Sequence, residues 1–384
     1  MTAFEFAAPT RILFGDGRAR EAAAIAATFG TRVLVVEGGS GRGATLASQL
    51  EGAGLTTTRL AMPGEPTHSL VTRAVEQARR DGREVVVAIG GGSVIDAGKA
   101  IAALLTNRGD PRDYLEVVGR GRPLTERGAP FVAIPTTAGT GAEVTRNAVL
   151  MVEEERVKVS LRSPLMLPTV ALVDPLLTLS LPPAVTASTG LDALTQCLEP
   201  FVSPQANPLS DAVAREGMRR ASTALRRAFH DGADVGARRD MAIASLCGGL
   251  ALANAKLGAV HGFAAPLGGM FPVPHGVACA RLLAPVAAAN VRALRARAPS
   301  SPALARYDEA ARILTGRARS RAEQLVDWLR ALTDELQVPA LSAFGLRASD
   351  VGDIAVRAKQ ASSMQGNPIA LDDEELNEVL EAAR

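Results

Sequence analysis

The stretch EVVVAIGGGSVIDAGKAIAALL, residues 84 to 105, decides how this chain folds. It begins with an apolar, valine-rich run that is typical of a buried β-strand. Three glycines follow, and the residues after them have the composition of a helix. We expect Ser93 to cap this helix, with Asp96 as the acid of a capping box. A strand that turns through glycines into a capped helix predicts one unit of an α/β domain.

The rest of the N-terminal half repeats this alternation. Alanine-rich helical stretches separate the first three of its apolar runs. Short apolar strands that alternate with amphipathic helices predict a parallel sheet covered by helices on both faces. The predicted strands are RVLVVE (32–37), EVVVAI (84–89), PFVAIPT (130–136) and TVALVD (169–174).

The strand pattern stops after LSLPPAVTASTG, residues 179 to 190, and the sequence continues as one helical pattern after another. A chain of 384 residues is too long for a single core, so we expect two domains. The boundary is predicted near Pro182–Pro183. It gives an α/β domain at residues 1–182 and an all-helical domain at residues 183–384. Residues 106–130 are expected to form a surface excursion between two elements.

The composition excludes several classes of protein. The net charge is +2, with 42 basic and 40 acidic residues, which gives no reason to expect nucleic acid or an anionic membrane as a partner. We find no apolar run long enough to predict a membrane span. The three cysteines are far apart and show no CxxC spacing, which favours a reducing compartment. The N-terminus lacks the features of a signal peptide, so we expect a cytoplasmic protein.

The glycine turn is a candidate phosphate-binding site. Gly90, Gly91 and Gly92 have no Cβ, so the backbone N–H groups of the turn can approach a ligand closely. The following helix offers unpaired N–H donors and a favourable dipole to a pyrophosphate. A tight turn alone would also need glycine, and the pattern is not the GxGxxG of the usual dinucleotide fold. Phosphate binding is favoured because the glycines lie between a clear strand and a capped helix.

A second loop, PTTAGTGAEVT (135–145), follows the next apolar strand and combines threonines with glycines. Hydroxyl groups and exposed backbone at the carboxyl end of a strand suit ribose, phosphate or carboxamide groups. An ordinary loop rich in turn-forming residues is the simpler interpretation. Two such loops at the ends of neighbouring strands favour a shared ligand, with Thr136, Thr137 and Thr140 as its candidate contacts.

The helical half places a few polar groups in apolar surroundings. In GLDALTQCLEPF, residues 190 to 201, Asp192 and Gln196 lie four residues apart and therefore on one face of a helix. A solvated polar pair is the simpler interpretation of that spacing alone. His261 and His275 belong to a second apolar segment, GAVHGFAAPLGGMFPVPHGVACA, in which prolines exclude one straight helix. We expect His261 to end one helix and His275 to open the next element.

Asp192, His261 and His275 together would form a set of two histidines and one carboxylate, which suits Fe(II) or Zn(II). Gln196 would be a fourth, neutral ligand through its amide oxygen, or a hydrogen-bond partner of a ligand.

These motifs together resemble the iron-containing (group III) alcohol dehydrogenases, in particular the lactaldehyde reductase or propanediol oxidoreductase branch. The resemblance covers nearly the whole chain, and the motifs occur in the order of the family. They are FGDGRARE (14–21), GGGSVIDAGKAIA, IPTTAGTGAEVT, VDPLLTLSLPP, TGLDAL, LGAVHG, PHGVACA and QGNP (365–368). The resemblance implies an N-terminal α/β dinucleotide-binding domain and an all-helical C-terminal domain, the dehydroquinate synthase-like fold.

The resemblance also implies an activity and roles for individual residues. The activity is hydride transfer between NAD or NADP and a small alcohol or aldehyde, assisted by Fe(II) or Zn(II), in a homodimer or larger homo-oligomer. Catalytic and metal-binding roles are implied for Asp192, His261 and His275. Contacts to the cofactor are implied for Gly38, Gly90, Gly91, Gly92, Ser93, Asp96, Thr136, Thr137, Thr140 and Lys158. Leu252, Phe263 and Ser363 fall where the family lines its substrate pocket.

Two departures from the family put the metal in question. The second metal ligand of the family is a histidine, and this chain has Gln196 there. The family also has a histidine at the position of Ala265. An amide oxygen is a poorer donor than imidazole for Fe(II) or Zn(II), so we expect weakened metal binding. The alternatives are a metal-independent enzyme similar to the maleylacetate reductases and a non-catalytic nucleotide-binding relative. Dehydroquinate synthase and glycerol dehydrogenase share the fold but differ around the metal.

Cofactor preference depends on the end of the strand at 32–37. A carboxylate there would bind the ribose 2′-hydroxyl of NAD and repel the 2′-phosphate of NADP. The family usually has Asp at this place, and this chain has Gly38. Glu37 precedes it and is expected to point to the other face of the sheet. With Arg42 available to a phosphate, the sequence favours tolerance of NADP.

Overall fold

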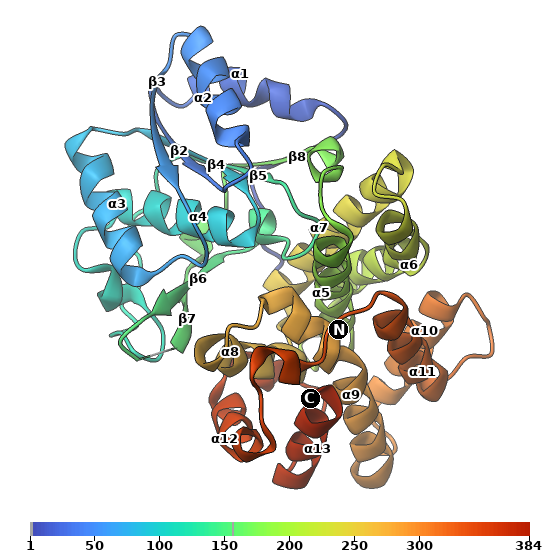
Figure 1. Ribbon diagram of the computed structural model, residues 1–384. Coiled ribbons are helices and arrows are strands. Elements are labelled where there is room, and N and C mark those ends of the chain that lie inside the picture. The colour runs from blue at the N-terminus through green and yellow to red at the C-terminus, as the bar shows by residue number, and fades with distance from the viewer. Residues whose placement is uncertain (1–2, 156) are drawn as a thin grey trace. The chain divides into compact units, whose positions relative to one another are not determined.

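The computed structural model describes residues 3–155 and 157–384, which form two compact units. The α/β unit consists of Ala7–Thr137 and Gly141–Thr178. The helical unit consists of Leu179–Arg384 together with Ala138–Thr140 and the segment that ends at Phe6. The colour gradient of Figure 1 separates the two units along the chain, and each is described here by itself.

The α/β unit is built on a six-stranded sheet with the strand order β1-β8-β5-β4-β2-β3, in which every neighbouring pair is parallel. The parallel sheet predicted from the sequence is therefore confirmed. The sequence missed β1 and β3, which lie at the two edges of the sheet and do not need the continuous apolar run of a central strand. The strands are β1 (Arg11–Phe14), β2 (Arg32–Glu37), β3 (Thr56–Ala61), β4 (Val85–Gly90), β5 (Phe131–Pro135) and β8 (Val170–Val173).

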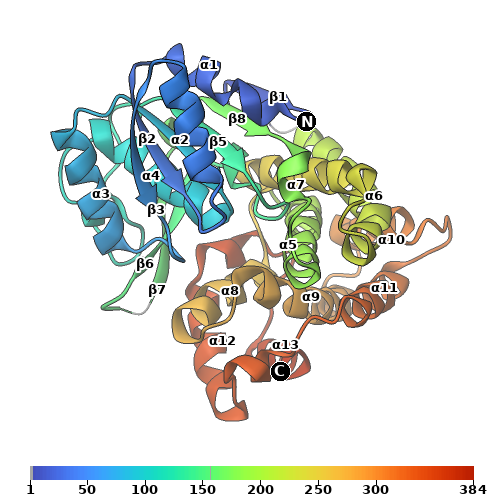
Figure 2. The same ribbon diagram turned by 45° about the horizontal axis from the view of Figure 1, so that its top comes forward.

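Helices cover both faces of this sheet, as Figure 2 shows. Alternate residues of β2 serve the two faces: Leu34 and Val36 pack in the cluster of α3 and α4, and Val33 and Val35 pack in the cluster of α1 and α2. Burial of each such side chain stabilises the fold by roughly 1.5–3 kcal/mol. The helices are α1 (Ala22–Ala27), α2 (Arg42–Gly52), α3 (His68–Arg80) and α4 (Gly92–Thr106).

The glycine turn joins β4 to α4, but the predicted cap is wrong. The N-cap residue of α4 is Gly91, and no side chain accepts a hydrogen bond from the first turn. Ser93 lies inside the helix, because the helix begins one residue before it. Asp96 turns towards the next layer, where its Oδ2 accepts a hydrogen bond from the backbone N–H of Val149 at 3.0 Å. The first turn of α4 is therefore left without a protein cap.

A β-hairpin that the sequence did not reveal packs on α4. Its strands are β6 (Asn147–Val152) and β7 (Val157–Arg162), which pair antiparallel. Lys99 of α4 is buried beneath it, and its Nζ donates hydrogen bonds to Ala142 O, Thr145 Oγ1 and Asn147 O at 2.7–2.8 Å. These bonds use all three N–H donors of an ammonium group.

Residues 106–130 were predicted as a surface excursion; Thr106 is the last residue of α4, and residues 107–130 contain one 3₁₀ turn (Pro111–Tyr114) and no α-helix or strand. The segment is not confined to the surface, since Tyr114, Leu115 and Leu124 are buried in the core of the α/β unit.

The helical unit begins with α5 at Pro183, a residue suited to the first position of a helix. Helix α9 is long and apolar enough to cross a membrane, and α7 with α8 would also pass such a test as one span. However, 78% of the apolar window of α9 is buried, and α7 and α8 meet at a bend of 100°. This apolar surface therefore serves the core of the unit. The helices are α5 (Pro183–Val202), α6 (Pro208–His230), α7 (Val235–Ala255), α8 (Ala259–Met270), α9 (His275–Arg297), α10 (Pro302–Thr315), α11 (Ala322–Glu335), α12 (Val351–Gln360) and α13 (Asp373–Ala383).

Candidate functional site

Helix α5 points Asp192 and Gln196 into the interior of the helical unit. Their side chains lie among buried residues on nearly every side of the helix, with residue exposures of 1% and 2%. The polar pair therefore does not lie on a solvated face. Asp192 Oδ1 and Gln196 Oε1 are buried and accept no hydrogen bond of normal geometry from the described residues. An unpaired buried acceptor costs about 1–3 kcal/mol, so these two oxygens indicate a missing electropositive partner.

The two histidines converge on Asp192. His275 is the first residue of α9, as the sequence predicted. His261 lies in the first turn of α8 and does not end α7, because α7 already stops at Ala255. The Nε2 atom of His261 lies 3.4 Å from Asp192 Oδ1, and the Nε2 atom of His275 lies 3.8 Å from it. The centroids of the two imidazole rings are 5.4 Å apart.

A cysteine that the sequence analysis missed joins this cluster. Cys279 Sγ lies 3.7 Å from His261 Nε2 and 3.6 Å from His275 Nε2. Together with Asp192 Oδ1, these donor atoms all lie within 4.8 Å of one another. The signal for Cys279 was present in the sequence, since it follows His275 by four residues, one turn of the same helix.

Glu199, also missed, fixes the orientation of His261. Its Oε2 accepts a hydrogen bond from the Nδ1–H of His261 at 2.7 Å, and its Oε1 accepts one from the backbone N–H of Val260 at 2.7 Å. A donating Nδ1–H leaves a lone pair on Nε2, which is the atom that faces Asp192. Glu199 follows Asp192 by seven residues on α5, so it belongs to the same helical face.

Two glycines allow the helices to approach closely enough to build the site. A Cβ on Gly258, just before α8, would lie 2.8 Å from Glu199 Oε1. A Cβ on Gly276, just after His275, would lie 2.8 Å from the backbone oxygen of Ser188 in α5. Both distances are shorter than normal contacts of a Cβ atom, so each position requires glycine to keep its helix against α5.

The ionisable groups of the cluster shift one another's pKa values. Burial favours neutral Asp192, but the charges of His275 and His261 keep the pKa of Asp192 below its usual range. The electrostatic interaction with Cys279 is the largest of the causes that raise the pKa of His275 to about 9. Burial opposes protonation of His261, yet the charge of Cys279 and hydrogen bonds to Asp192 and Glu199 raise its pKa well above the ordinary value. Positive charge is therefore favoured within the cluster, and a divalent cation would supply it as protons on the histidines do.

The donors present fit such a cation. Carboxylate oxygen, imidazole nitrogen and thiolate sulfur are the ligand types of zinc, and the first two also bind iron(II). Asp192, His261 and Cys279 are buried, and the side chain of His275, 36% exposed, is the part of the cluster that solvent reaches. Asp192 Oδ1, which is buried without a hydrogen bond of normal geometry, faces both histidines and is available to such a cation.

The first two glycines of the turn in the α/β unit differ in how much room the protein leaves them. A Cβ on Gly90 would lie 2.5 Å from Val94, so this glycine is required by the packing of the protein itself. A Cβ on Gly91 would have only an ordinary 3.4 Å contact with Thr137. Packing therefore does not require a glycine at Gly91. That the missing side chain lets a ligand approach the backbone N–H groups stays a prediction.

The end of β2 presents little negative charge. Glu37 is buried, and its Oε1 forms an ion pair with Arg59 at 2.6 Å. Arg42 donates a hydrogen bond to the backbone oxygen of Leu177 at 3.0 Å. A Cβ on Gly38 would touch only Val94, at 3.4 Å, and one on Gly39 would have no neighbour within 4 Å.

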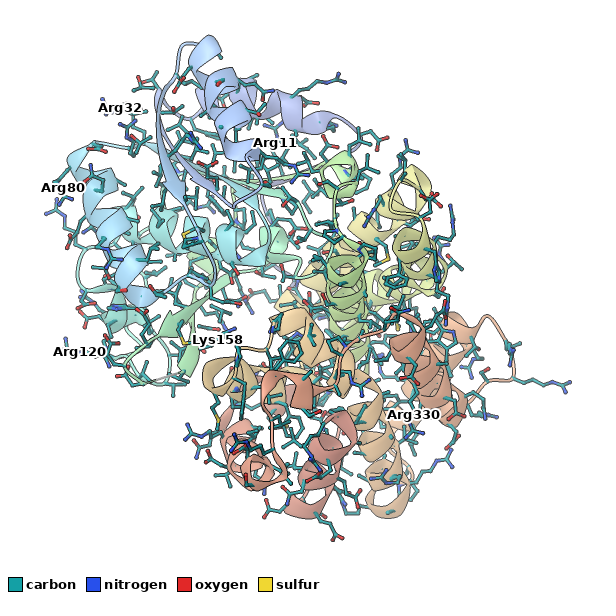
Figure 3. The ribbon with its side chains drawn as sticks, viewed as in Figure 1. Arg11, Arg32, Arg80, Arg120, Lys158 and Arg330 are labelled. Carbon is teal, nitrogen blue, oxygen red and sulfur yellow. The ribbon has the colours of Figure 1, made fainter. Side chains whose placement is uncertain are left out.

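The remaining predicted site residues lie in different surroundings. Lys158, labelled in Figure 3, extends from β7 and forms an ion pair with Glu65 at 3.2 Å. Thr136 is buried at the end of β5, and Thr140 groups with the helical unit. Among the predicted substrate contacts, Leu252 and Ser363 are half-buried, whereas Phe263 is fully buried in the helical core. Their roles stay predictions.

Comparisons with known proteins agree with this geometry. Residues 9–175 match the family model described as iron-containing alcohol dehydrogenase, and residues 186–384 match its C-terminal counterpart. Alcohol dehydrogenase 4 of Saccharomyces cerevisiae is 36% identical over 319 residues, which cover 83% of this chain and 80% of the yeast protein. A crystal structure of 1,3-propanediol oxidoreductase superposes with a TM-score of 0.92, at 31% identity and full coverage of both chains. Sulfoacetaldehyde reductase from Bifidobacterium kashiwanohense, solved with NAD⁺, superposes with a TM-score of 0.86, at 29% identity, covering 100% of this chain and 99% of that one. The chain therefore belongs to the iron-containing alcohol dehydrogenase family, in the propanediol oxidoreductase-like branch, and is an oxidoreductase that acts on CH–OH groups.

Proposed function

We propose that this chain is an NAD(P)-dependent alcohol dehydrogenase, or in the reverse direction an aldehyde reductase, that acts on a small alcohol with the help of a divalent metal. The observation that carries the proposal is the convergence of Asp192, His261 and His275 around buried oxygen atoms that lack a partner. A cation held by these side chains would act as a Lewis acid on the oxygen of the substrate. The nicotinamide would accept or donate the hydride.

The side chains of the site have separate tasks in this proposal. Asp192 supplies the negative charge, and the two imidazoles offer their Nε2 atoms towards it. Glu199 fixes the tautomer and the ring orientation of His261. Apolar packing around α5 excludes water, which strengthens the electrostatic interactions within the site. In the α/β unit, the uncapped N-terminus of α4 would receive the pyrophosphate of the cofactor.

We also propose that the enzyme accepts NADP. Position 38 is a glycine and has no carboxylate, and the carboxylate of Glu37 is buried in an ion pair with Arg59. A 2′-phosphate would therefore meet no opposing charge from these residues. Comparison of kcat/KM for NADPH and NADH tests this preference, and a large advantage of NADH refutes it.

A metal-independent reductase is the second candidate function, and the replacement of the family histidine by Gln196 is the observation that favours it. Its test is shared with that of the main proposal. The metal content of protein purified anaerobically without chelators is measured by mass spectrometry, and turnover is measured on a panel of small alcohols and aldehydes. About one Fe or Zn per chain with turnover supports the metal-assisted enzyme. Turnover without any metal, even after Fe(II) and Zn(II) are offered, supports the alternative.

A matched pair of variants completes the test. His261→Ala removes a cluster donor, and we expect it to lose metal and turnover together. His230→Ala is the control, because His230 lies in the same unit, is exposed and pairs only with surface groups such as Glu335. Unchanged turnover of His261→Ala on every substrate of the wild type contradicts the metal-assisted mechanism. The predicted homodimer or larger assembly is checked separately by light scattering.

A further inference from the structure

We infer that Cys279, and not Gln196, supplies the fourth strong ligand of the metal, so that the site is Asp-His-His-Cys and prefers Zn(II) to Fe(II). The inference rests on the metal-dependent function proposed above. It concerns which atoms of this chain bind the ion and which ion they select.

The separations of the donor atoms carry the inference. For a tetrahedral zinc with bonds of about 2.3 Å to sulfur and about 2.0–2.1 Å to nitrogen and oxygen, neighbouring S and N ligands lie about 3.6 Å apart, and N and O ligands about 3.3 Å apart. Cys279 Sγ lies 3.6 Å and 3.7 Å from the two Nε2 atoms. Asp192 Oδ1 lies 3.4 Å and 3.8 Å from the same atoms. These four separations are therefore already near the spacing that one zinc ion imposes, and the other two pairs of donor atoms lie within 4.8 Å.

The chemistry of the donors points the same way. A thiolate is a charged, soft donor that suits zinc, whereas an amide oxygen is neutral and hard. The resemblance places a histidine ligand of the family at Gln196. Its absence from α5 is balanced by a sulfur donor on α9, one turn beyond His275. The number of strong ligands is thus kept while the fourth moves to a different helix, and the oxygen of the substrate would bind as a fifth ligand, an expansion that catalytic zinc sites allow.

Gln196 has a different partner. Gln196 follows Asp192 by one turn of α5, so its amide lies on the same face of the helix as the carboxylate. The amide is therefore placed to orient the carboxylate that faces the two histidines, as a hydrogen-bond partner of a ligand does in many metal sites. Asp192 Oδ1 itself remains without a hydrogen bond of normal geometry, which leaves it available to the cation.

The other two cysteines provide controls. Cys197 and Cys247 are buried and free, and burial raises the pKa of both thiols. Neither belongs to the group of donor atoms around Asp192. Cys247→Ser therefore removes a thiol of similar burial without touching the proposed ligand set.

The experiment reads the ligand sphere directly rather than the activity. Full-length protein is loaded with Zn(II) for X-ray absorption spectroscopy and with Co(II) for optical spectroscopy. The wild type is compared with Cys279→Ser, Cys247→Ser and Gln196→Leu. We expect one sulfur scatterer at about 2.3 Å in the zinc protein. We also expect a near-ultraviolet sulfur-to-cobalt charge-transfer band in the cobalt protein. Both features should disappear in Cys279→Ser and persist in Cys247→Ser and Gln196→Leu.

Affinity gives a second readout. Competition with a chelator should show Zn(II) bound more tightly than Fe(II). Cys279→Ser should weaken the binding of Zn(II) by about 100-fold, because loss of a direct ligand costs at least as much as loss of an outer partner. Gln196→Leu should weaken it less, by about 10-fold, the lower end of what loss of an outer partner costs.

Each contrary result is decisive, and the wild-type spectrum decides even if a variant does not fold. A bound zinc with only nitrogen and oxygen neighbours overturns the role of Cys279 but leaves the metal-assisted enzyme standing. Loss of metal from Gln196→Leu with an intact Cys279→Ser site assigns the fourth ligand to the amide and overturns the inference. A wild type that binds neither ion overturns both this inference and the metal in the proposed function.

Discussion

The role of Glu199 yields the sharpest prediction. Both of its oxygens are used, one by the Nδ1–H of His261 and one by the backbone N–H of Val260. Glu199→Gln keeps the shape of the side chain but replaces one acceptor by an NH₂ donor. The backbone N–H of Val260 cannot change its nature, whereas an imidazole can move its proton from Nδ1 to Nε2. We therefore expect the amide NH₂ to face His261 and to force the other tautomer.

The new tautomer carries its proton on the atom that faces Asp192 and Cys279. The metal must then displace this proton and bind a less basic imidazole. Loss of such an outer partner costs about 10- to 100-fold in metal affinity, which is about 1.4–2.7 kcal/mol. Glu199 is 5% exposed, so no water from bulk solvent replaces the missing acceptor without cost.

The assay is a chelator competition that measures the Kd for Zn(II) of the wild type and of Glu199→Gln, with thermal unfolding of the metal-free proteins beside it. Glu143→Gln is the matched control, because Glu143 is an equally buried carboxylate but belongs to the α/β unit. A Kd of Glu199→Gln within about twofold of the wild type, about 0.4 kcal/mol, refutes the reasoning. If Glu143→Gln loses a similar amount of Zn(II) affinity, the loss in Glu199→Gln does not come from the tautomer of His261.

Three further predictions concern the α/β unit. Gly38→Asp should shift the ratio of kcat/KM for NADH to kcat/KM for NADPH in favour of NADH by about tenfold or more, because a carboxylate there binds the ribose hydroxyl and repels a 2′-phosphate. Gly39→Asp should shift this ratio less. Gly91→Ala should leave the melting temperature nearly unchanged and raise the Kd for NAD(P)H about tenfold. Gly90→Ala should instead destabilise the protein by about 1–3 kcal/mol, because its Cβ would lie 2.5 Å from Val94. Calorimetry measures the stability of the two variants, and fluorescence titration measures their affinity for the cofactor. Burial raises the pKa of Glu143 to about 7, so the folded protein holds an extra proton above pH 4.5, and its stability falls as the pH rises from there towards 7. Glu143→Gln should abolish this dependence of stability on pH, which urea unfolding at a series of pH values measures.

The sequence predicted the central strands of the sheet because these strands are buried on both faces and must be apolar throughout. It missed β1 and β3 because an edge strand tolerates polar residues such as the threonines of β3. The hairpin of β6 and β7 was missed although its signal is local, since β6 alternates half-buried and buried residues and pairs with the next strand along the chain.

The candidate metal site was predictable only in part. Asp192, His261 and His275 are rare polar groups in apolar segments, so composition and the family resemblance both pointed to them. Cys279 behaves as a small apolar residue in a helical pattern, so its spacing of four residues from His275 was not read as a ligand signal until the convergence of α5 and α9 placed its sulfur beside the histidines. The cap at Ser93 was wrong because the helix begins two residues earlier than the capping pattern suggests, with Gly91 as the N-cap.

The donor atoms around Asp192 come from three helices that are distant in sequence, α5, α8 and α9. A cation bound there would act as a cross-link, much as a disulfide does, and would close a loop of more than eighty residues between Asp192 and Cys279. An ion that binds only the folded state at 100 times its Kd stabilises that state by about 2.7 kcal/mol. Removal of the ion by a chelator would then loosen the helical unit selectively. Amide hydrogen exchange would rise at the start of α8 and α9, while the sheet would keep its protection.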